Sequence, residues 1–432
     1  MVISCGFNWT SNPRSTHQNI MDETQVFNII WEVLSESHNE YMADFDQMPF
    51  SRILKAFLSH FYEIFKEVDN FGDIEKIKQK NDILLVFSHL FKKLNPSIYP
   101  CFAFAWLDII SSRHFMPFML STVSEFHNQE RWLKMQELFN ALFIFLKENI
   151  YENSETTPAL EKFFEGTLKI CLVVLHDYPE FLCYYYFQFI NNLPLYRTGN
   201  LRNMILAAYP KSIRLPDPAN EITKYEPSNV LHGQDRQTLL QFYVDEGDYY
   251  TLKADLDNYL GKKLHPNTSN HYLETKSEAK LKQICEYLES CQVIKNHRRI
   301  IDTGVVHATM LYLASDIEEM KTVKELENPG LAEKFELMCK FLSTPVRDIL
   351  LNSMFNELRL LNMSTVFFLS TLLQIFRNAN PEENIVSSQI ARICVGRLRL
   401  PKIQPWGLLV FRNKISKEAK FKSMNITTQQ QP

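Results

Sequence analysis

Glycine is scarce in this chain. The 432 residues include only 11 glycines, and the two closest, Gly396 and Gly407, lie eleven residues apart, whereas glycine usage averages about 7%. Loops that bind phosphate groups need two or three glycines within a short stretch, because their backbone amides must approach the ligand closely. The sequence therefore excludes both a P-loop and a GxGxxG turn.

Paired cysteines are also missing. The eight cysteines, at positions 5, 101, 171, 183, 285, 291, 339 and 394, include no CxxC pair. Cys101, Cys171 and Cys183 lie inside apolar runs, where a reduced cysteine behaves as a small hydrophobic residue. This pattern argues against a zinc knuckle or a disulfide framework and favours a reducing, intracellular compartment.

The chain lacks a strong positive charge and a clear membrane segment. Its net charge of −4 argues against a globally basic nucleic-acid-binding protein. The first residues, MVISCGFNWTSNPRST, have neither the basic start nor the apolar core of a secretory signal. The best membrane candidate, Leu360–Phe376, contains six polar residues and is shorter than the roughly 20 residues that a bilayer requires. We expect a buried helix there.

Helical periodicity recurs along most of the chain, whereas strand-like alternation is nearly absent. Apolar residues return every three or four positions, which places them on one face of a helix. One such stripe is Leu54, Phe57, Leu58, Phe61, Ile64 and Phe65, and others follow near residues 83–94, 135–146 and 351–361. Short breaks delimit helices of about 12–20 residues, a pattern typical of an α-solenoid of antiparallel helix pairs. We predict an all-α fold.

Proline marks the breaks between these helices. Thr157-Pro158 fits an N-cap followed by proline at the first helical position, and Pro345 opens another helix. We predict a disordered N-terminus at 1–20, a first helical lobe at 21–210 and a second helical lobe at 278–415. Between the lobes, 211–277 is predicted to be a long irregular connector with short helices, and 416–432 is predicted to be a polar tail.

No arrangement of residues predicts a catalytic or metal site. His60 and Glu63 share a helix face but lack a second ligand pair, so an exposed helix edge is favoured. His176-Asp177 has no serine or cysteine in a nucleophile elbow beside it, and a contact with the end of its helix explains it better. We predict no enzyme activity, no metal and no cofactor.

Two features could bind a partner. The stretch 392–422 carries nine basic residues and one acid, Glu418, which could dock an acidic segment or an RNA backbone, or form an ordinary solvated basic surface. Trp106 and Trp406 could anchor a partner peptide, although core packing is favoured for both. A helical-repeat RNA-binding or transport adaptor is therefore the alternative to a scaffold.

Several motifs resemble those of a known family. In order they are FAFAWLDIISSRHF, RWLKMQELFNALFIFLK, GTLKICLVVLHDYPEFLC, LRNMILAAYPKSIRLPDP, NSMFNELRLLNMSTVFFLSTLL, PWGLLVF and KEAKF. Together they resemble the C-terminal domain of the large scaffold subunits of the CCR-NOT deadenylase complex, the family called general negative regulator of transcription subunit one. The resemblance covers roughly residues 46–421 and is poor from Ala219 to about Asn296.

The resemblance implies a HEAT-like, non-catalytic platform that docks the Not-box subunits. By docking these subunits, the platform would support mRNA deadenylation and decay, translational repression and transcription regulation, in cytoplasm and nucleus. The nucleases and mRNA would be indirect partners, with direct RNA contact possible through the basic stretch. The resemblance also implies a further segment after KEAKF, without which we expect apolar surface near Trp406 and Leu409. Within the matching motifs, the residues chosen as partner-binding are Arg202, Lys211, Arg214, Asp217, Arg397, Arg399 and Trp406.

Overall fold

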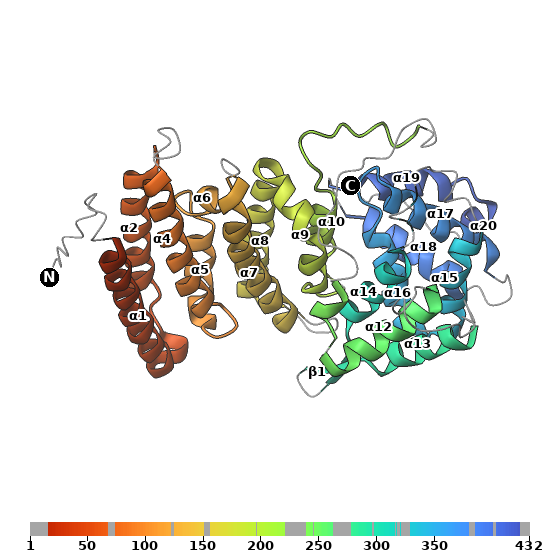
Figure 1. Ribbon diagram of the computed structural model, residues 1–432, viewed down its shortest axis with the longest axis horizontal. Helices are drawn as coiled ribbons and strands as arrows, with labels where there is room; N and C mark the ends of the chain where they lie inside the picture. Colours follow the sequence, from red (N-terminus) through yellow and green to blue (C-terminus); the bar gives the residue numbers. More distant parts are fainter. Residues whose placement is uncertain are drawn as a thin grey trace, which may run out of the picture. The chain divides into compact units, whose positions relative to one another are not determined.

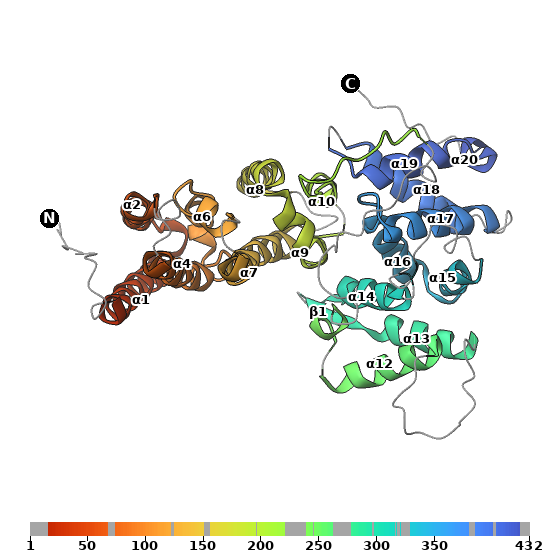
Figure 2. The ribbon, with the colours of Figure 1, turned by 45° about the horizontal axis from the view of Figure 1, so that its top comes forward.

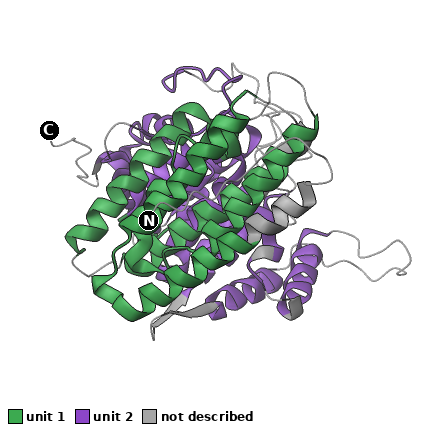
Figure 3. Ribbon diagram, turned by 90° about the vertical axis from the view of Figure 1, so that its left-hand side faces the viewer, with its two compact units in different colours: residues 1–181, 192–197 green, residues 182–191, 198–432 purple. Residues whose placement is uncertain are grey.

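The computed structural model describes residues 16–67, 74–121, 125–150, 156–195, 197–220, 239–244, 246–261, 278–295, 298–315, 317, 320, 329–379, 385–400 and 403–423. These residues are mostly helical, which confirms the all-α prediction (Figure 1). One two-stranded antiparallel hairpin accompanies the helices, formed by β1 (Gln292–Lys295) and β2 (Arg298–Ile301), with Gln292 opposite Ile301. The chain divides into two compact units, which Figure 3 distinguishes by colour.

Unit 1 comprises residues 1–181 and 192–197. Its helices are α1 (Thr16–Tyr41), α2 (Met48–Phe65), α4 (Ile74–Lys93), α5 (Ala103–Ile110), α6 (Met116–Leu120), α7 (Glu125–Asn149), α8 (Pro158–Asp177) and the start of α9 (Pro179–Asn191). Helices α1, α4 and α7 pack side by side in one row, while α2, α5 and α8 form a second row (Figure 2). Two rows of paired helices are the layered arrangement of an α-solenoid.

The predicted apolar stripe on α2 faces the interior of unit 1. Leu54, Leu58, Phe61 and Phe65 are buried, and Phe61 makes edge contacts with Phe87 and Phe118. Thr157 caps α8 as expected, because its side-chain oxygen accepts a hydrogen bond from the backbone N–H of Leu160 at 3.3 Å. The local rules of helix formation therefore hold here.

Unit 2 comprises residues 182–191 and 198–432. Its elements are the end of α9, α10 (Gly199–Leu206), the short 3₁₀ helix η4 (Leu240–Phe242), α12 (Glu246–Leu260), α13 (Glu278–Ser290), the hairpin, α14 (Thr303–Leu313), α15 (Pro329–Phe341), α16 (Thr344–Asn356), α17 (Met363–Asn378), α18 (Ile385–Leu398), α19 (Trp406–Ile415) and α20 (Ala419–Ser423). Here α13, α15, α17 and α19 pack in sequence, and α14, α16 and α18 do the same. Pro345 lies in the first turn of α16, as predicted.

The membrane candidate is a buried helix of unit 2. Helix α17 has 16 residues, and most of its side chains, Thr365 and Thr371 among them, lie in the interior. No helix in the described ranges has both the length and the apolarity needed to cross a bilayer. Cys394 of this unit is likewise packed as an apolar group: it is fully buried, and burial raises the pKa of its thiol to about 12.

The division between the units falls between Phe181 and Thr198, earlier than residue 210, where the sequence places the end of the first lobe. Helix α10 belongs to unit 2 because it packs against α18 and the residues after it. Asn203 donates to the carbonyl of Arg397 at 3.0 Å, and Gly199 faces the side chain of Leu400 so closely that an added Cβ would lie 2.4 Å from it.

The other predicted segments lie only partly within the described residues. Residues 16–20 of the predicted disordered N-terminus belong to α1, and 1–15 lie outside the described residues. In the predicted connector, 221–238 and 262–277 lie outside them, while η4 and α12 are short helices. In the predicted polar tail, α20 forms because Phe421 is buried against Phe376, with ring centroids 6.3 Å apart.

Candidate interaction surface of unit 2

An extended segment follows α10 and is here called the strap, residues 207–220. It has no helix or strand of its own and turns only locally, where the N–H of Ile213 bonds the carbonyl of Pro210 at 3.0 Å. The strap appears in Figure 1 as the long yellow-green segment after α10. It contains the whole AAYPKSIRLPDP part of the LRNMILAAYPKSIRLPDP motif, so this part of the motif is an irregular segment.

The strap is fixed to α19 by two side chains. The indole N–H of Trp406 donates to the carbonyl of Pro216 at 2.7 Å, and the amide of Asn413 donates to the carbonyl of Pro218 at 3.2 Å. These contacts bring together the LPDP and PWGLLVF motifs, which lie about 190 residues apart in the sequence. The two motifs therefore form one structural feature.

Helix α19 itself packs very closely on the loop after α16. A Cβ added at Gly407 would lie 2.7 Å from the backbone carbon of Leu358, and the N–H of Gly407 bonds the carbonyl of Arg359 at 3.0 Å. Only glycine permits such an approach between backbones. Helix α19, which holds the strap, is thus packed directly on the core of unit 2.

Three of the seven residues predicted to bind partners are buried. Arg202, Arg397 and Trp406 are 4%, 7% and 7% exposed, so the exposure that the prediction assumed does not hold for them. The expected apolar surface near Trp406 is also absent, because that ring is covered and Leu409 is half-buried. Lys211, Arg214, Asp217 and Arg399 are exposed, and the first three lie together on the strap.

The two buried arginines contribute to the interior instead. Arg397 donates to the side-chain oxygens of Asn352 and Asn356 at 3.1 and 2.7 Å and to the Asn352 carbonyl at 3.0 Å. Burial and the neighbouring charge of Arg202 lower the pKa of the Arg397 guanidinium well below its usual value. Burial also lowers the pKa of Arg202, to about 10. Through its bonds to Asn352 and Asn356, Arg397 links α18 to α16 inside unit 2.

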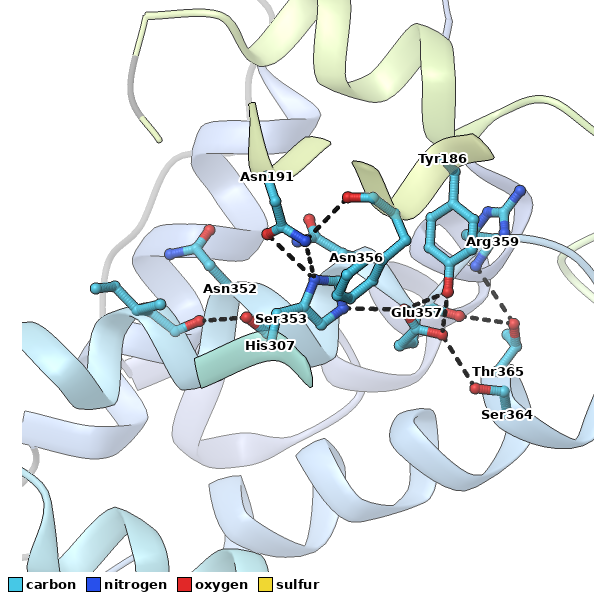
Figure 4. A network of polar contacts seen from close by, with 12 residues as sticks. Tyr186, Asn191, His307, Asn352, Ser353, Asn356, Glu357, Arg359, Ser364 and Thr365 are labelled. Atoms are coloured by element: carbon cyan, nitrogen blue, oxygen red, sulfur yellow. Dashed lines mark hydrogen bonds and ion pairs between the residues drawn. The ribbon is translucent and has the colours of Figure 1, made fainter. Parts of the chain in front are cut away.

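A buried polar network of unit 2, not predicted from the sequence, holds the end of α9 in place (Figure 4). Its centre is Glu357, whose carboxylate accepts hydrogen bonds from Tyr186 at 3.0 and 3.2 Å and from Ser364 at 3.2 Å. The guanidinium of Arg359 stacks on the Tyr186 ring at 3.6 Å and donates to the carbonyl of Cys183 at 3.2 Å. The network thus links α9 to the loop between α16 and α17.

His307 completes the network. It is fully buried, with Nε2 at 3.2 Å from Glu357 Oε1 and Nδ1 at 3.2 Å from the Asn191 amide nitrogen. Burial lowers the pKa of the His307 imidazole, although the hydrogen bond to Glu357 acts in the opposite direction. A neutral ring fits this geometry, because Nε2–H can donate to the carboxylate while Nδ1 accepts from the amide. Such an enclosed arrangement positions helices and offers no access to a substrate.

The other candidates for chemistry lie on the surface of unit 1. His176 and Asp177 contact each other at 2.7 Å with exposed side chains at the end of α8, and Glu63 forms an exposed ion pair with Lys66 at 2.6 Å. Within the described residues, no cluster of three histidine, cysteine, aspartate or glutamate side chains could hold a metal ion.

Many of the nine basic residues in 392–422 already have structural partners. Arg392 pairs with Asp348, Arg412 bonds its neighbour Asn413, and Lys420 donates to the carbonyls of Phe376 and Ala379 at the end of α17. Arg397 is buried, and Lys402 lies outside the described residues. The other basic residues in the described part of the stretch are exposed or half-buried, so the stretch keeps a basic surface with fewer free cations than its composition suggests.

Comparisons with known proteins agree with this architecture. The family model described as "CCR4-Not complex component, Not1" matches residues 65–430. Subunit let-711 of the Caenorhabditis elegans CCR4-NOT transcription complex is 28% identical over 404 residues, covering 89% of this chain and 14% of that protein. General negative regulator of transcription subunit 1 of Schizosaccharomyces pombe is 26% identical over 394 residues, covering 89% of this chain and 17% of that protein.

Two solved structures share the fold. The NOT1 superfamily homology domain from Chaetomium thermophilum has a TM-score of 0.77 and 22% identity, covering 94% of this chain and 75% of that one. A Not1 C-terminal domain in complex with Not4 has a TM-score of 0.75 and 21% identity, covering 95% of this chain and 80% of that one. The chain spans less than a fifth of the length of the curated relatives above. Because the family model covers most of the sequence, this chain belongs to the Not1 family of CCR4-NOT complex components.

Proposed function

We propose that this chain is a non-catalytic docking module that binds the Not-box subunits of the CCR4-NOT complex. The observation that carries this proposal is the shared fold with a Not1 C-terminal domain in complex with Not4, in a chain that belongs to the Not1 family. A homologue of Not4 is therefore a further candidate partner. The buried polar network supports a structural interior, because its polar groups hydrogen-bond one another inside the protein.

The exposed part of the strap is the surface that we assign to this docking. Lys211, Arg214 and Asp217 are exposed on a segment that Trp406 and Asn413 hold in place. A partner that binds a pre-fixed segment avoids most of the entropic cost of ordering it. A stable interface buries about 800 Å² on each side, so the strap would supply a few charged anchors within a larger contact.

Co-purification tests the docking role. The chain is tagged and expressed with the Not-box subunits and the Not4 homologue of its own organism, and we expect at least one of them to co-purify stoichiometrically. Lys211→Glu combined with Arg214→Glu should weaken that association at least about tenfold. Lys169→Glu, an exposed change on α8 of unit 1, is the matched control and should leave it unchanged.

Failure of all of these subunits to bind the folded chain would overturn the docking role. If the strap variant binds the subunits as well as the original chain does, the interface lies elsewhere than on the strap. The wider role follows from docking: within the complex the module would support mRNA deadenylation and decay, translational repression and transcription regulation, in cytoplasm and nucleus. The nucleases and mRNA would then be reached through other subunits.

A further inference from the structure

Unit 2 also has a groove, here called the α17 groove. It has a volume of about 720 Å³ and is lined by Ala332, Leu369, Ser370, Thr371, Leu373, Gln374, Arg377, Asn378, Lys414, Lys417 and Glu418. Helix α17 forms its floor, and it packs against α15 and α19 on either side (Figure 2). This volume is within the range of about 300–1,000 Å³ typical of ligand pockets.

The groove carries positive charge that the described residues do not neutralise. Arg377 is paired with Glu418 at 2.6 Å, which leaves Lys414 and Lys417. Within the part of the chain that the structure describes, neither lysine ammonium has an ion-pair or hydrogen-bond partner. Partial burial, together with the charges of Arg377 and Lys417, lowers the pKa of Lys414. A negative group in the groove would relieve this repulsion.

The floor of the groove combines apolar with polar side chains, and one buried hydroxyl there is not used. Ala332, Leu369 and Leu373 are buried. Thr371 is 1% exposed, and its hydroxyl has no hydrogen-bond partner among the described residues. Native proteins rarely leave a buried hydroxyl unpaired, since this costs free energy. A peptide that enters the groove would supply both apolar side chains for the floor and backbone groups for such a hydroxyl.

We infer that the α17 groove binds an acidic peptide segment of a partner subunit, with Lys414 and Lys417 pairing its carboxylates and Leu369 and Leu373 contacting its apolar side chains. The inference rests on the proposed docking function for the identity of the partner. Peptide is favoured over nucleic acid because single-stranded nucleic acids bind along basic tracks with aromatic stacking platforms. No aromatic side chain lines this groove, and only two of its cations are unpaired among the described residues.

Fluorescence anisotropy tests the groove with labelled overlapping peptides that tile the Not-box subunits and the Not4 homologue. We expect peptides rich in aspartate and glutamate, with interspersed leucine or phenylalanine, to bind, and their affinity to fall as salt screens the charges. Lys414→Glu combined with Lys417→Glu should weaken binding at least about tenfold without lowering the Tm, because within the described residues neither ammonium makes an ion pair or hydrogen bond that the change would break. Lys422→Glu, an exposed change on α20, is the matched control and should bind like the original chain.

A charge-swapped peptide distinguishes the loss of a direct contact from a structural change elsewhere in the variant. Replacing the acids of the best peptide by lysines should abolish binding to the original chain and restore it to the double variant. The inference is overturned if no acidic peptide binds, or if the double variant binds the best peptide unchanged. It is also overturned if a labelled oligoadenylate RNA, rather than the peptides, shows the dependence on Lys414 and Lys417. If acidic peptides bind the groove while intact subunits fail to co-purify, the docking proposal fails and the groove assignment stands.

Discussion

The interiors of the two units differ in chemistry. Unit 1 is packed largely with aromatic and aliphatic side chains, such as Phe61, Phe87 and Phe91, and its buried charged residues in the described part of the chain are Lys80 and Arg131. The described interior of unit 2 also holds Arg202, Asp257, Lys334, Asp348, Glu357, Arg359 and Arg397. Apolar packing tolerates changes that conserve volume, whereas a buried charge requires every partner to stay in place. Unit 2 should therefore be the more sensitive to single substitutions and to pH.

The largest effect is expected at the centre of the polar network. Glu357→Ala removes the acceptor of Tyr186, His307 and Ser364, so these buried groups lose their partner. A buried donor left without its acceptor costs about 1–3 kcal/mol, and with three such donors we expect a total loss of about 3–5 kcal/mol in the free energy of unfolding. Urea unfolding measures it, with Glu63→Ala at the exposed pair of unit 1 as the control that leaves the midpoint unchanged. If both variants have the same urea midpoint, the two units do not differ in their sensitivity to substitution at these sites.

A smaller loss is expected when a single hydroxyl of the network is removed. Tyr186→Phe keeps the ring under Arg359 but deletes both hydrogen bonds to Glu357. Hydrogen bonds to charged groups contribute about 1.5–3 kcal/mol each to stability, and because the two share one hydroxyl we expect a total loss near about 2 kcal/mol. Chemical unfolding of this variant alone and together with Glu357→Ala should be non-additive. Fully additive losses would show that the two residues do not act as one network.

The pH dependence of stability sharpens the comparison further. The pKa of His307 is lowered in the folded protein, so the unfolded chain binds a proton more readily. Its contribution to stability is complete above about pH 6.5, the pKa of an unperturbed histidine, and decreases as the pH falls below that value, by at most about 1.4 kcal/mol per pH unit. When the free energy of unfolding is measured between neutral and mildly acidic pH, its decrease with falling pH should be smaller in His307→Gln than in the original chain. The exposed His176 is the control, and an identical slope in His176→Gln and His307→Gln would contradict the assignment.

The smallest effect is expected in the aromatic interior of unit 1. Phe61→Leu replaces one apolar side chain by a somewhat smaller one beside Phe65, Phe87 and Phe118. Such swaps usually cost less than about 1.5 kcal/mol. Thermal unfolding should therefore show a shift smaller than that of Tyr186→Phe. A larger shift for Phe61→Leu would reverse the proposed order of sensitivity.

Sequence patterns predict the local structure well and the polar interior poorly. The stripe from Leu54 to Phe65, the Thr157 cap and the start of α16 at Pro345 follow from rules that act within a few residues. The burial of Arg202 and Arg397 does not follow from such rules, because α10 and α18 meet across almost 200 residues of sequence.

Partners that are distant in sequence also determine the burial of Trp406 and Glu357. The indole of Trp406 is covered through its bond to Pro216, and Glu357 meets Tyr186 from a helix 171 residues earlier in the chain. Nothing in the residues beside Glu357 distinguishes it from an exposed acid. The motif HDYPEFLC does indicate a special segment, but its spacing carries no information about the partners of α9.

The anchoring of the strap has a consequence for how the molecule is made. Pro216 leaves the ribosome about 190 residues before Trp406, its hydrogen-bond partner. At typical synthesis rates of 5–20 residues per second, this interval lasts roughly 10–40 s. During that time the segment with Lys211 and Arg214 has no α19 to rest on, so the nascent chain presents it in a form that the finished protein no longer has.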